Sequence, residues 1–469
     1  MKKQLITRQG FNVMFSLLFG FLLLFSIGCK DKNDNGYNNG DNTDTEELPN
    51  WYTNVPEAED VVMYSVNPRV FAEQDALKAI TERLDEIKAL GTNVIWIMPI
   101  YAQGEGTRNI KDGRGSPYCV RDYKAVNAEY GTLEDLQNLV KKAHEKGMAV
   151  ILDWVPNHTS WDNAWIENEG WYTKCPIADT IIHPAGTTWT DVADLNYANH
   201  DMRAAMIDAM KYWFTAANID GYRVDALDYV PETDFLQQMT SELRELNRGR
   251  RILMFAEGHE QDYLAYGFDM DFGWNFYDRL KNLYNGGTMS RFFSGALGEI
   301  EQGKKRIHFT TNHDKSAWEK TDVQQFNGER GAMTAFVITA TLGRMPLIYS
   351  TQEIGREAKV PFFSCTTIDW NSNPAITNEY KNIMKAYTSS NVFTRGTVKS
   401  YPLNDVVCFT KTIDDKKVAM VAANVRDKNV TFSVPEALQG DWKNMMDNST
   451  VILSETVEMT PYQYYILEK

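Results

Sequence analysis

Four stretches of this chain join a short apolar run to an acidic side chain: Asp153-Trp-Val-Pro-Asn-His158, Gly221-Tyr-Arg-Val-Asp225, Phe255-Ala-Glu257-Gly258 and Phe309-Thr-Thr-Asn-His-Asp314. Each places a carboxylate at or near the end of a run that is predicted to be a β-strand. The carboxyl ends of parallel strands meet on one face of a (β/α)8 barrel, where such folds assemble their active sites. The four stretches therefore predict a barrel with a cluster of carboxylates at one end.

The chain alternates from residue 60 onward between continuous apolar runs and runs with helical spacing. Helical runs such as 133–146 repeat apolar residues three and four positions apart and stop at a glycine, here Gly147. The strands predicted in this way are 61–66, 93–97, 149–154, 221–224, 252–256, 268–272, 306–310 and 346–349. The predicted helices are 76–90, 133–146, 202–217, 234–247, 289–302, 331–342 and 378–387.

Repeated strand–helix units with continuously apolar strands are typical of a parallel sheet that is buried on both faces. A doubly wound sheet is the alternative, but it would need a glycine-rich phosphate loop after an early strand, and the sequence has none there. We therefore predict an α/β fold, a (β/α)8 TIM barrel over residues 51–391. A long connection after strand three, 159–197, is predicted to be a short inserted domain. Period-two strands over 392–469 predict a C-terminal antiparallel β-sandwich domain.

Composition argues against some partners and is compatible with others. The chain has 469 residues and a formal net charge of −15, without a long run of lysine and arginine. A nucleic acid is therefore not an expected partner, because binding to a polyanion relies on clustered cations. Aromatic residues make up 12% of the chain, and their rings would suit neutral carbohydrate, although core packing explains most of them equally well.

The first 50 residues are predicted to be a targeting segment followed by a tether. Residues 1–28 combine basic residues with an apolar run, as in a secretory signal, and Ser26-Ile-Gly-Cys29 resembles the lipidation site of bacterial lipoproteins. The alternative is an uncleaved membrane anchor, since the apolar run is just long enough to span a bilayer. Residues 29–50 carry almost nothing apolar and are predicted to be a disordered tether.

The remaining cysteines give no sign of a metal site. They are not arranged in Cys-x-x-Cys pairs, the spacing that is typical of metal binding. An exported protein could oxidise them, but the sequence gives no pairing. We expect buried free thiols at Cys119, Cys175, Cys365 and Cys408.

Taken in this order, the four opening stretches resemble conserved regions I to IV of glycoside hydrolase family 13, the α-amylase family. Further stretches are similar to the family's strand two, its loop with a stacking tyrosine, the end of its inserted domain and its strand eight: Gly91–Ile100, Tyr118–Asp122, Asp194–Asn196 and Gly343–Tyr349. The resemblance covers about residues 60–390 and implies a retaining glycosidase that acts on α-linked glucans.

The resemblance implies a role for each catalytic position. Asp225 matches the nucleophile, Glu257 the acid/base, and Asp314 the carboxylate that holds hydroxyls of the distorted sugar. Asp225 and Glu257 would then lie about 5–5.5 Å apart, the separation of enzymes that retain configuration. Arg223 precedes Asp225 by two residues on one strand and so points to the same face; its cation would favour the ionised nucleophile.

Other matched residues are implied to bind sugar or to support the site. His158 and His313 match hydroxyl-binding residues, and Tyr118 matches the ring that stacks on the reacting sugar. Asp153 matches the carboxylate that supports the arginine, and Asp122 a supporting carboxylate near the tyrosine. Taken singly, such an aspartate more often caps a helix and such a histidine more often fills a core, so the joint pattern carries the assignment.

The chain also departs from the family pattern. Asp228 and Tyr229 stand where many α-amylases carry Lys-His, whose side chains contact the leaving-side sugar. Gly258-His259 follows the acid, and this pair indicates that the subsite for the leaving-side sugar has a geometry of its own. Thr351 replaces a glycine that is common after strand eight.

A calcium ion is the cofactor that the resemblance brings into question. Asn157 and Asp194 match two oxygen ligands of the family's calcium, and the backbone carbonyl of Tyr229 matches a third. Relatives without this calcium also carry Asn157-His-Thr-Ser160, so the sequence leaves both alternatives open.

The expected activity is hydrolysis of internal α-1,4 bonds in starch-like polysaccharides and oligosaccharides. Cyclomaltodextrinase or neopullulanase, exo-α-glucosidase and 4-α-glucanotransferase activities of the same family remain alternatives. A starch-binding surface protein on an inactive barrel is a more remote one. Acidic residues after Cys29 resemble the export signal of Bacteroidetes lipoproteins. They imply a lipid-anchored protein of a Gram-negative outer membrane, on its surface or periplasmic face, with other starch-uptake proteins as candidate partners.

Overall fold

The computed structural model describes residues 51–469 except 111, 231, 260–261, 302–304 and 415. The predicted signal segment 1–28, the tether 29–50 and the lipidation site Cys29 lie outside the described residues. Within the part that is described, no helix is long and apolar enough to cross a membrane.

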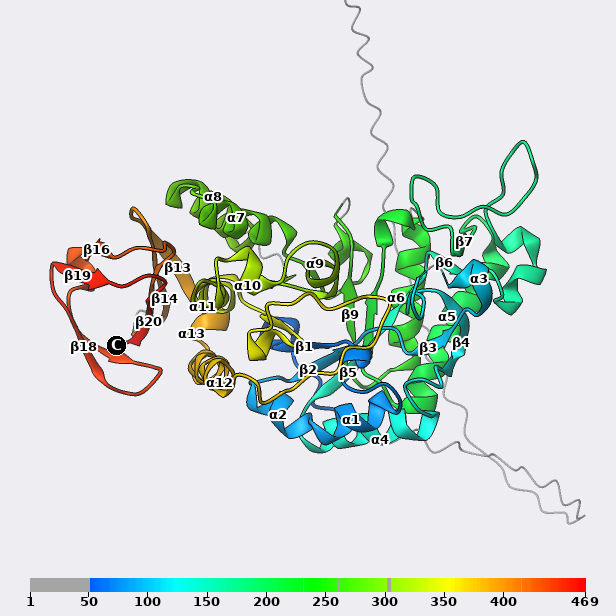
Figure 1. Cartoon of the computed structure of the whole chain (residues 1–469), viewed down its shortest axis with the longest axis horizontal. Helices are drawn as coiled ribbons and strands as arrows, with labels where there is room; N and C mark the ends of the chain where they lie inside the picture. Colours follow the sequence, from blue (N-terminus) through cyan, green and yellow to red (C-terminus); the bar gives the residue numbers. More distant parts are fainter. Residues whose placement is uncertain (1–50, 111, 231, 260–261, 302–304, 415) are drawn as a thin grey trace, which may run out of the picture. The chain divides into compact units, whose positions relative to one another are not determined.

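Short parallel strands form a central sheet that closes as a barrel (Figure 1). The sheet order is β11-β10-β9-β8-β5-β2-β1-β12, and a parallel bridge between His308 and Pro346 joins its two ends. The amide of Leu347 donates to the carbonyl of His308 at 2.8 Å across this closure. The strands are β1 (Met63–Val66), β2 (Val94–Ile97), β5 (Ala149–Trp154), β8 (Gly221–Val224), β9 (Leu253–Ala256), β10 (Met270–Phe272), β11 (Arg306–Ile307) and β12 (Leu347–Tyr349).

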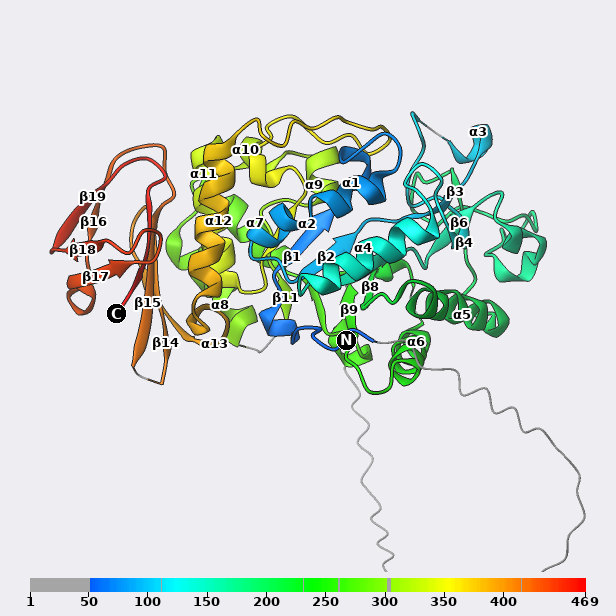
Figure 2. The same ribbon diagram turned by 90° about the horizontal axis from the view of Figure 1, so that it is seen from below.

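Helices cover the outside of these strands (Figures 1 and 2). Helix α4 shows why such segments are helical: Thr132 and Asp135 form a capping box at its start, and its buried residues recur three and four positions apart. The longer helices are α1 (Ala76–Glu82), α4 (Leu133–Glu145), α5 (His200–Ala217), α6 (Thr233–Leu246), α7 (Trp274–Tyr284), α8 (Met289–Glu301), α11 (Glu329–Ile338) and α12 (Pro374–Thr388). Shorter ones are α2 (Leu84–Ala89), α3 (Gly106–Asn109), α9 (His313–Trp318), α10 (Asp322–Gln325) and α13 (Val392–Arg395).

The predicted barrel is confirmed, with differences at particular elements. The predicted helix 76–90 is two helices, α1 and α2, divided at Arg83. The predicted strand 306–310 is limited to Arg306–Ile307, which pairs with Asp271 and Phe272 of β10; beyond it only an isolated bridge from His308 to Pro346 continues the pairing. Helix α7 has no counterpart among the predicted elements.

Two antiparallel strand pairs stand outside the barrel sheet. β3 (Tyr101–Gln103) pairs with β4 (Val120–Val126), and β6 (His158–Ser160) pairs with β7 (Val192–Asp194). The second pair joins the two ends of the long connection that was predicted as an inserted domain. His158 lies opposite Asp194 in its register, so the connection returns to the mouth of the barrel.

The C-terminal strands form a six-stranded antiparallel sheet and a separate two-stranded sheet. Alternate residues of the larger sheet enter different cores. Val407 and Phe409 pack in the main core with the barrel helices, whereas Val406 and Cys408 pack in a second core with the smaller sheet. β14 and β15 lie beside α13 (Figure 2). The strands are β13 (Thr397–Pro402), β14 (Val406–Ile413), β15 (Lys417–Asn424), β16 (Val430–Ser433), β17 (Gly440–Asn444), β18 (Thr450–Leu453), β19 (Thr456–Met459) and β20 (Tyr464–Glu468).

The four cysteines of the described part are all free thiols. Cys119 and Cys408 are buried, as predicted. Cys175 and Cys365 are only half-buried, so the prediction of burial is wrong for these two. Cys175 lies in the long connection and Cys365 in the irregular stretch after β12.

Candidate active site

Arg223 is the centre of the site, because its guanidinium joins three of the predicted carboxylates. Its Nη1 donates to Asp153 at 2.8 Å and to Asp225 at 2.6 Å, and its Nη2 lies 3.2 Å from Glu257. The arginine is 1% exposed, as expected for a side chain that points into the mouth of the barrel. Strands β5, β8 and β9 are neighbours in the sheet, so their carboxyl ends bring these residues together.

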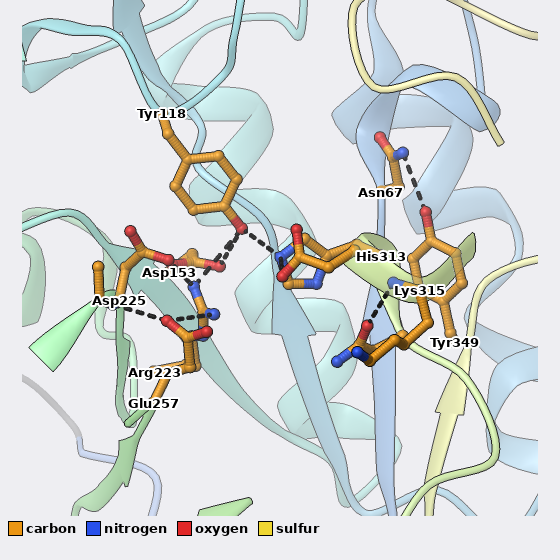
Figure 3. A network of polar contacts seen from close by, with 12 residues as sticks. Asn67, Tyr118, Asp153, Arg223, Asp225, Glu257, His313, Lys315 and Tyr349 are labelled. Carbon is orange, nitrogen blue, oxygen red and sulfur yellow. Dashed lines mark hydrogen bonds and ion pairs between the residues drawn. The ribbon is translucent and has the colours of Figure 1, made fainter. Parts of the chain in front are cut away.

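Tyr118 connects this ion cluster to the predicted histidine (Figure 3). Its hydroxyl donates to Asp153 at 3.0 Å and lies 2.9 Å from Nε2 of His313. The same ring nitrogen of His313 lies 3.4 Å from the carboxylate of Asp314. The oxygen of Asp153 that accepts from Tyr118 also accepts from the indole of Trp96 at 3.1 Å, while Arg223 donates to the other oxygen. Asp153 therefore holds the arginine and the tyrosine in place while being fully enclosed.

One cation faces several carboxylates here, and their protonation reflects that imbalance. Burial raises the pKa of Asp153 to about 7, and Arg223 opposes this shift. Burial also raises the pKa of Asp225 well above its usual range, with Arg223 again opposing and Glu257 adding to the rise. The predicted effect of Arg223 on Asp225 thus has the right direction, but burial outweighs it.

The two predicted histidines are neutral at neutral pH. Burial lowers the pKa of His158 to about 4 and that of His313 to about 3. A neutral imidazole can donate one hydrogen bond and accept another, which suits contact with a sugar hydroxyl. Burial likewise raises the pKa of Tyr118 well above its usual range, so its hydroxyl keeps its proton.

A cavity of about 1020 Å³ lies over the cluster and exposes Asp225, Glu257 and Asp314. Its lining also contains Tyr118, His158 and His313, together with other aromatic residues, of which only Tyr229 was singled out from the sequence. These aromatic residues are Trp189, Tyr229, Trp318, Phe362 and Phe363. Phe362 stacks on Tyr118 with ring centroids 5.7 Å apart.

The structure brings together most of the predicted residues, but not Asp122. On β4 the side chain of Tyr123 points inward, and Asp122 next to it is exposed, because successive residues of a strand face opposite sides. The carboxylate of Asp122 accepts from the amide of Lys124 at 2.8 Å and lines a different cavity. The prediction that Asp122 supports the site is therefore corrected.

Trp96 and the aromatic lining other than Tyr229 are the parts of the site that were not predicted from the sequence. Trp96 lies in the stretch Gly91–Ile100. Its position on a predicted barrel strand was the signal that could have assigned it to the site. Phe362 and Phe363 lie in an irregular stretch between β12 and α12 without a recognisable motif. Only the three-dimensional course of the chain brings them to Tyr118.

Two backbone features shape the mouth of the barrel. Gly221 begins β8 at φ +147°, and a Cβ there would collide with the backbone of Leu253 on the neighbouring strand. Thr351 follows β12 at φ 86°, a left-handed conformation that a β-branched residue rarely adopts. This is the position where the family commonly has glycine, so the structure gives a physical reason for that glycine.

Two of the predicted calcium ligands, Asn157 and Asp194, lie on adjacent stretches of backbone. The amide of Leu195, next to Asp194, donates to the carbonyl of Asn157 at 3.1 Å. Burial raises the pKa of Asp194 to about 6, and Glu232 contributes to the rise. One carboxylate oxygen of Glu232 is buried without a hydrogen-bond partner among the described residues. Such oxygen donors fit calcium in kind, although no group of three or more acidic, histidine or cysteine side chains in the described part has metal-site geometry.

Comparison with known proteins gives the family. The model for the catalytic domain of alpha amylase matches residues 36–191 and 186–401. The chain belongs to the alpha-amylase family. Both the predicted resemblance and the predicted fold are thereby confirmed.

Relatives in this family differ in their named activities. Alpha-amylase 3 of Dictyoglomus thermophilum is 27% identical over 350 residues, which cover 66% of this chain and 66% of that protein. The probable oligo-1,6-glucosidase 2 of Bacillus subtilis is 30% identical over 213 residues, 38% of this chain and 36% of that protein. The chain thus spans less than two thirds of the length of these relatives. An alpha-amylase structure from Lactobacillus plantarum has a TM-score of 0.77 at 23% identity, with 88% of this chain and 99% of that one covered.

Proposed function

We propose that this protein is a retaining glycoside hydrolase that cleaves internal α-1,4 bonds of starch-like glucans. The observation that carries the proposal is the meeting of Asp225 and Glu257 on one guanidinium, at 2.6 and 3.2 Å, inside one cavity. Two carboxylates that contact the same small cation are close together, as the double-displacement mechanism requires.

The first step makes a covalent intermediate. A carboxylate oxygen of Asp225 attacks the anomeric carbon and forms a β-linked glycosyl ester, while Glu257 gives its proton to the departing sugar oxygen. In the second step Glu257 takes a proton from water, whose oxygen attacks the same carbon and releases Asp225. Two inversions leave the product in the α configuration. Asp314, 39% exposed at its side chain, is available to bind hydroxyls of the distorted ring.

The buried ion cluster holds fewer positive charges than carboxylates. Burial raises the pKa of Asp153 to about 7 and also raises that of Asp225, since one guanidinium cannot balance all the neighbouring carboxylates. The cluster therefore retains a proton near neutral pH, whereas Glu257 is the group that we propose transfers a proton to the leaving oxygen. Arg223 keeps its shortest contact with Asp225, which favours negative charge on the attacking group.

Product analysis tests the proposal. With soluble starch, we expect iodine colour to fall faster than reducing ends accumulate, because internal cuts shorten long chains early. NMR of the first products should show α anomers. Colour that persists while reducing sugar rises would indicate an exo-acting α-glucosidase, and initial β anomers would overturn the retaining mechanism.

The same assay separates the other activities of the family. A cyclomaltodextrinase or neopullulanase would prefer cyclodextrins or pullulan to starch, and an oligo-1,6-glucosidase would prefer α-1,6-linked oligosaccharides. A 4-α-glucanotransferase would make products longer than a maltoheptaose starting material. A starch-binding protein would cleave none of these substrates and would only be retarded in a starch gel.

Calcium belongs to the proposal as a structural cofactor. Asn157 and Asp194 would hold it, and Glu232, whose buried oxygen has no partner among the described residues, is close enough to influence Asp194 electrostatically. When bound, the ion would neutralise buried carboxylates and fix the ends of the inserted stretch. Treatment with a chelator should lower the melting temperature if calcium is bound, and added calcium should restore it. An unchanged melting curve would reject the ion.

Lipid anchoring at the cell envelope is the proposed location. The lipidation-like stretch ending at Cys29 supports it. Replacing this residue, Cys29→Ser, should release the protein from the membrane fraction. Unchanged fractionation would favour an uncleaved membrane anchor instead.

A further inference from the structure

Two segments that line the cavity lie outside the barrel sheet. Tyr118 precedes β4, and Phe362 lies in the irregular stretch between β12 and α12. Their rings are nevertheless stacked, with centroids 5.7 Å apart and an interplanar angle of 14°. The hydroxyl of Tyr118 also lies within hydrogen-bond distance of Asp153 and His313. Strand pairing in the barrel does not fix these positions, so other contacts must hold the two segments.

Arg69 holds both segments with one guanidinium. Its Nη1 donates to the carbonyl of Gly115 at 2.7 Å and to the carbonyl of Phe362 at 3.1 Å. Gly115 lies shortly before Tyr118 and next to Ser116, whose hydroxyl accepts from the amide of Tyr118 at 3.1 Å. The same side chain thus fixes the backbone that carries each of the two stacked rings.

The guanidinium is enclosed and is itself fixed. Arg69 is 1% exposed and belongs to the turn Pro68–Val70, which follows β1. Its Nη2 donates to the side-chain carbonyl of Gln103 at 2.8 Å, and its Nε lies 3.5 Å from the carboxylate of Glu129. Its own backbone carbonyl accepts from the amide of Thr366 at 3.0 Å. The arginine therefore links a barrel strand to both segments of the cavity wall.

The turn that carries Arg69 is tied to the neighbouring barrel strand. The side chain of Asn67 accepts from the amide of Arg69 at 3.1 Å and donates to the hydroxyl of Tyr349 at 3.2 Å (Figure 3). The amide of Asn67 donates to the hydroxyl of Ser350 at 3.0 Å. Because β1 and β12 are paired in the sheet, the guanidinium is presented from a base that two strands hold in place.

The two segments also approach each other closely through their backbones. The amide of Arg114 donates to the carbonyl of Phe363 at 2.7 Å. Gly113, with φ +51°, lies beside this contact, and a Cβ there would collide with the same carbonyl oxygen. Such a close approach requires one fixed register between the segments. A planar guanidinium, whose donors point in fixed directions, can impose that register, whereas a lysine ammonium has no such fork.

We propose that Arg69 is a positioning residue: it fixes the ring and the hydroxyl of Tyr118 for contact with the reacting sugar, without touching the sugar itself. This inference rests on the proposed function and adds to it a residue outside the cavity lining. Loss of the fork lets Tyr118 move relative to Asp153 and His313. A displacement of about 1 Å in an active site can cost about 10²-fold in rate.

A double-mutant cycle tests whether Arg69 acts through Tyr118. Arg69→Lys keeps the positive charge and the aliphatic stem but loses the fork. In the otherwise wild-type protein, this substitution should lower kcat on maltoheptaose about 10- to 100-fold, with KM changed by less than about threefold. In a Tyr118→Ala background it should lower kcat by less than about threefold, because the ring that it positions is gone. Equal factors in the two backgrounds, or an unchanged kcat in the single variant, would overturn the proposal.

Arg114 offers a matched control. Its guanidinium bonds the carboxylate of Glu129 at 2.8 Å, as a neighbour of Arg69, but its side chain is 35% exposed and does not line the cavity. Arg114→Ala should therefore leave kcat within about twofold of the wild type. A loss as large as that of Arg69→Lys would assign the effect to the ion cluster around Glu129 and would overturn the role of the fork.

Hydrogen exchange keeps this inference separate from the proposed function. In Arg69→Lys, amides of 115–119 and 362–366 should exchange faster, while α4 and α5 keep their wild-type protection. Unchanged protection of the two segments would overturn the proposal even if the wild type hydrolyses starch. If the wild type cleaves neither starch nor maltoheptaose, the proposed function fails, and exchange still decides whether Arg69 holds the segments. Should Arg69→Lys not fold, Gln103→Ala removes one acceptor of the fork and takes its place in both measurements.

Discussion

The floor and the rim of the cavity consist of different types of residue. The floor consists of Arg223, Asp153, Asp225 and Glu257 at strand ends and His313 at the start of α9; it is charged or polar and is bound together by short contacts (Figure 3). The rim, consisting of Trp189, Tyr229, Trp318, Phe362 and Phe363, is aromatic and comes from loops and the end of α9. The floor residues can therefore catalyse bond cleavage. The rim residues can only bind the substrate and thereby determine which substrate is preferred.

This difference separates rate from preference. Buried charges interact strongly and lose their function when one partner is removed. Exposed rings contribute modest, nearly independent contacts. Floor variants should thus change the chemistry for every substrate, and rim variants should change the ranking of substrates.

The nucleophile gives the largest expected effect. Asp225→Asn keeps the shape of the side chain and removes the attacking charge, so kcat should fall about 10⁴-fold or more. Circular dichroism and the urea midpoint should remain those of a folded protein. Activity above about a tenth of the wild type would show that Asp225 is not the nucleophile, and the division between floor and rim would lose its basis.

The acid should give a large effect that depends on the leaving group. Glu257→Gln cannot donate a proton, so cleavage of maltoheptaose should fall by about 10²- to 10⁴-fold. α-Maltosyl fluoride should lose far less, because fluoride departs with little protonation. Steady-state rates on the two substrates check this. Equal losses would mean that Glu257 does not act as the acid.

The sequence was sufficient to predict the floor because its residues lie at the ends of strands within recognisable stretches. Asp153, Arg223 and Asp225 come from β5 and β8, and neighbouring strands must bring their ends together. The rim could not be predicted in this way. Trp189 and Phe362 reach the cavity through long irregular segments, whose course depends on tertiary packing rather than on local periodicity.

Two predictions failed at single elements. Asp122 was expected to support the site because it matches a supporting carboxylate of the family, but the alternation of β4 turns its side chain outward. Helix α7 was not predicted, although its buried residues have helical spacing. Neighbourhood in sequence is a weaker guide than the side of the element on which a residue falls.

The buried carboxyl of Asp153 should make the stability of the folded protein depend on pH. Burial raises the pKa of Asp153 to about 7 in the folded protein, so the native state keeps a proton that the unfolded chain releases. Its contribution to stability is present below pH about 4 and is lost as pH rises towards 7. Asp153→Asn removes this dependence, and activity should also fall about 10²-fold as Arg223 loses its support.

Urea midpoints at pH 5 and pH 8 check the sign. The drop between the two values should be smaller in Asp153→Asn than in the wild type. The rim variant Trp189→Ala should keep the wild-type drop, since it removes no titrating group. An unchanged drop in Asp153→Asn would show that this carboxyl does not retain a proton in the folded state.

The smallest effect concerns the backbone that leads from the floor towards the rim. Thr351, at φ 86°, opens the stretch that later carries Phe362. Thr351→Ala and Thr351→Gly both empty the same buried space, but only glycine adopts this conformation without a steric penalty. The glycine variant should therefore be more stable than the alanine variant by about 1 kcal/mol, the reverse of the usual order at an ordinary position. Urea unfolding of the pair measures the difference, with kcat on maltoheptaose expected to be similar in both. If the alanine variant is equally stable, the left-handed conformation at Thr351 carries no strain, and the glycine that is common here in relatives needs another explanation.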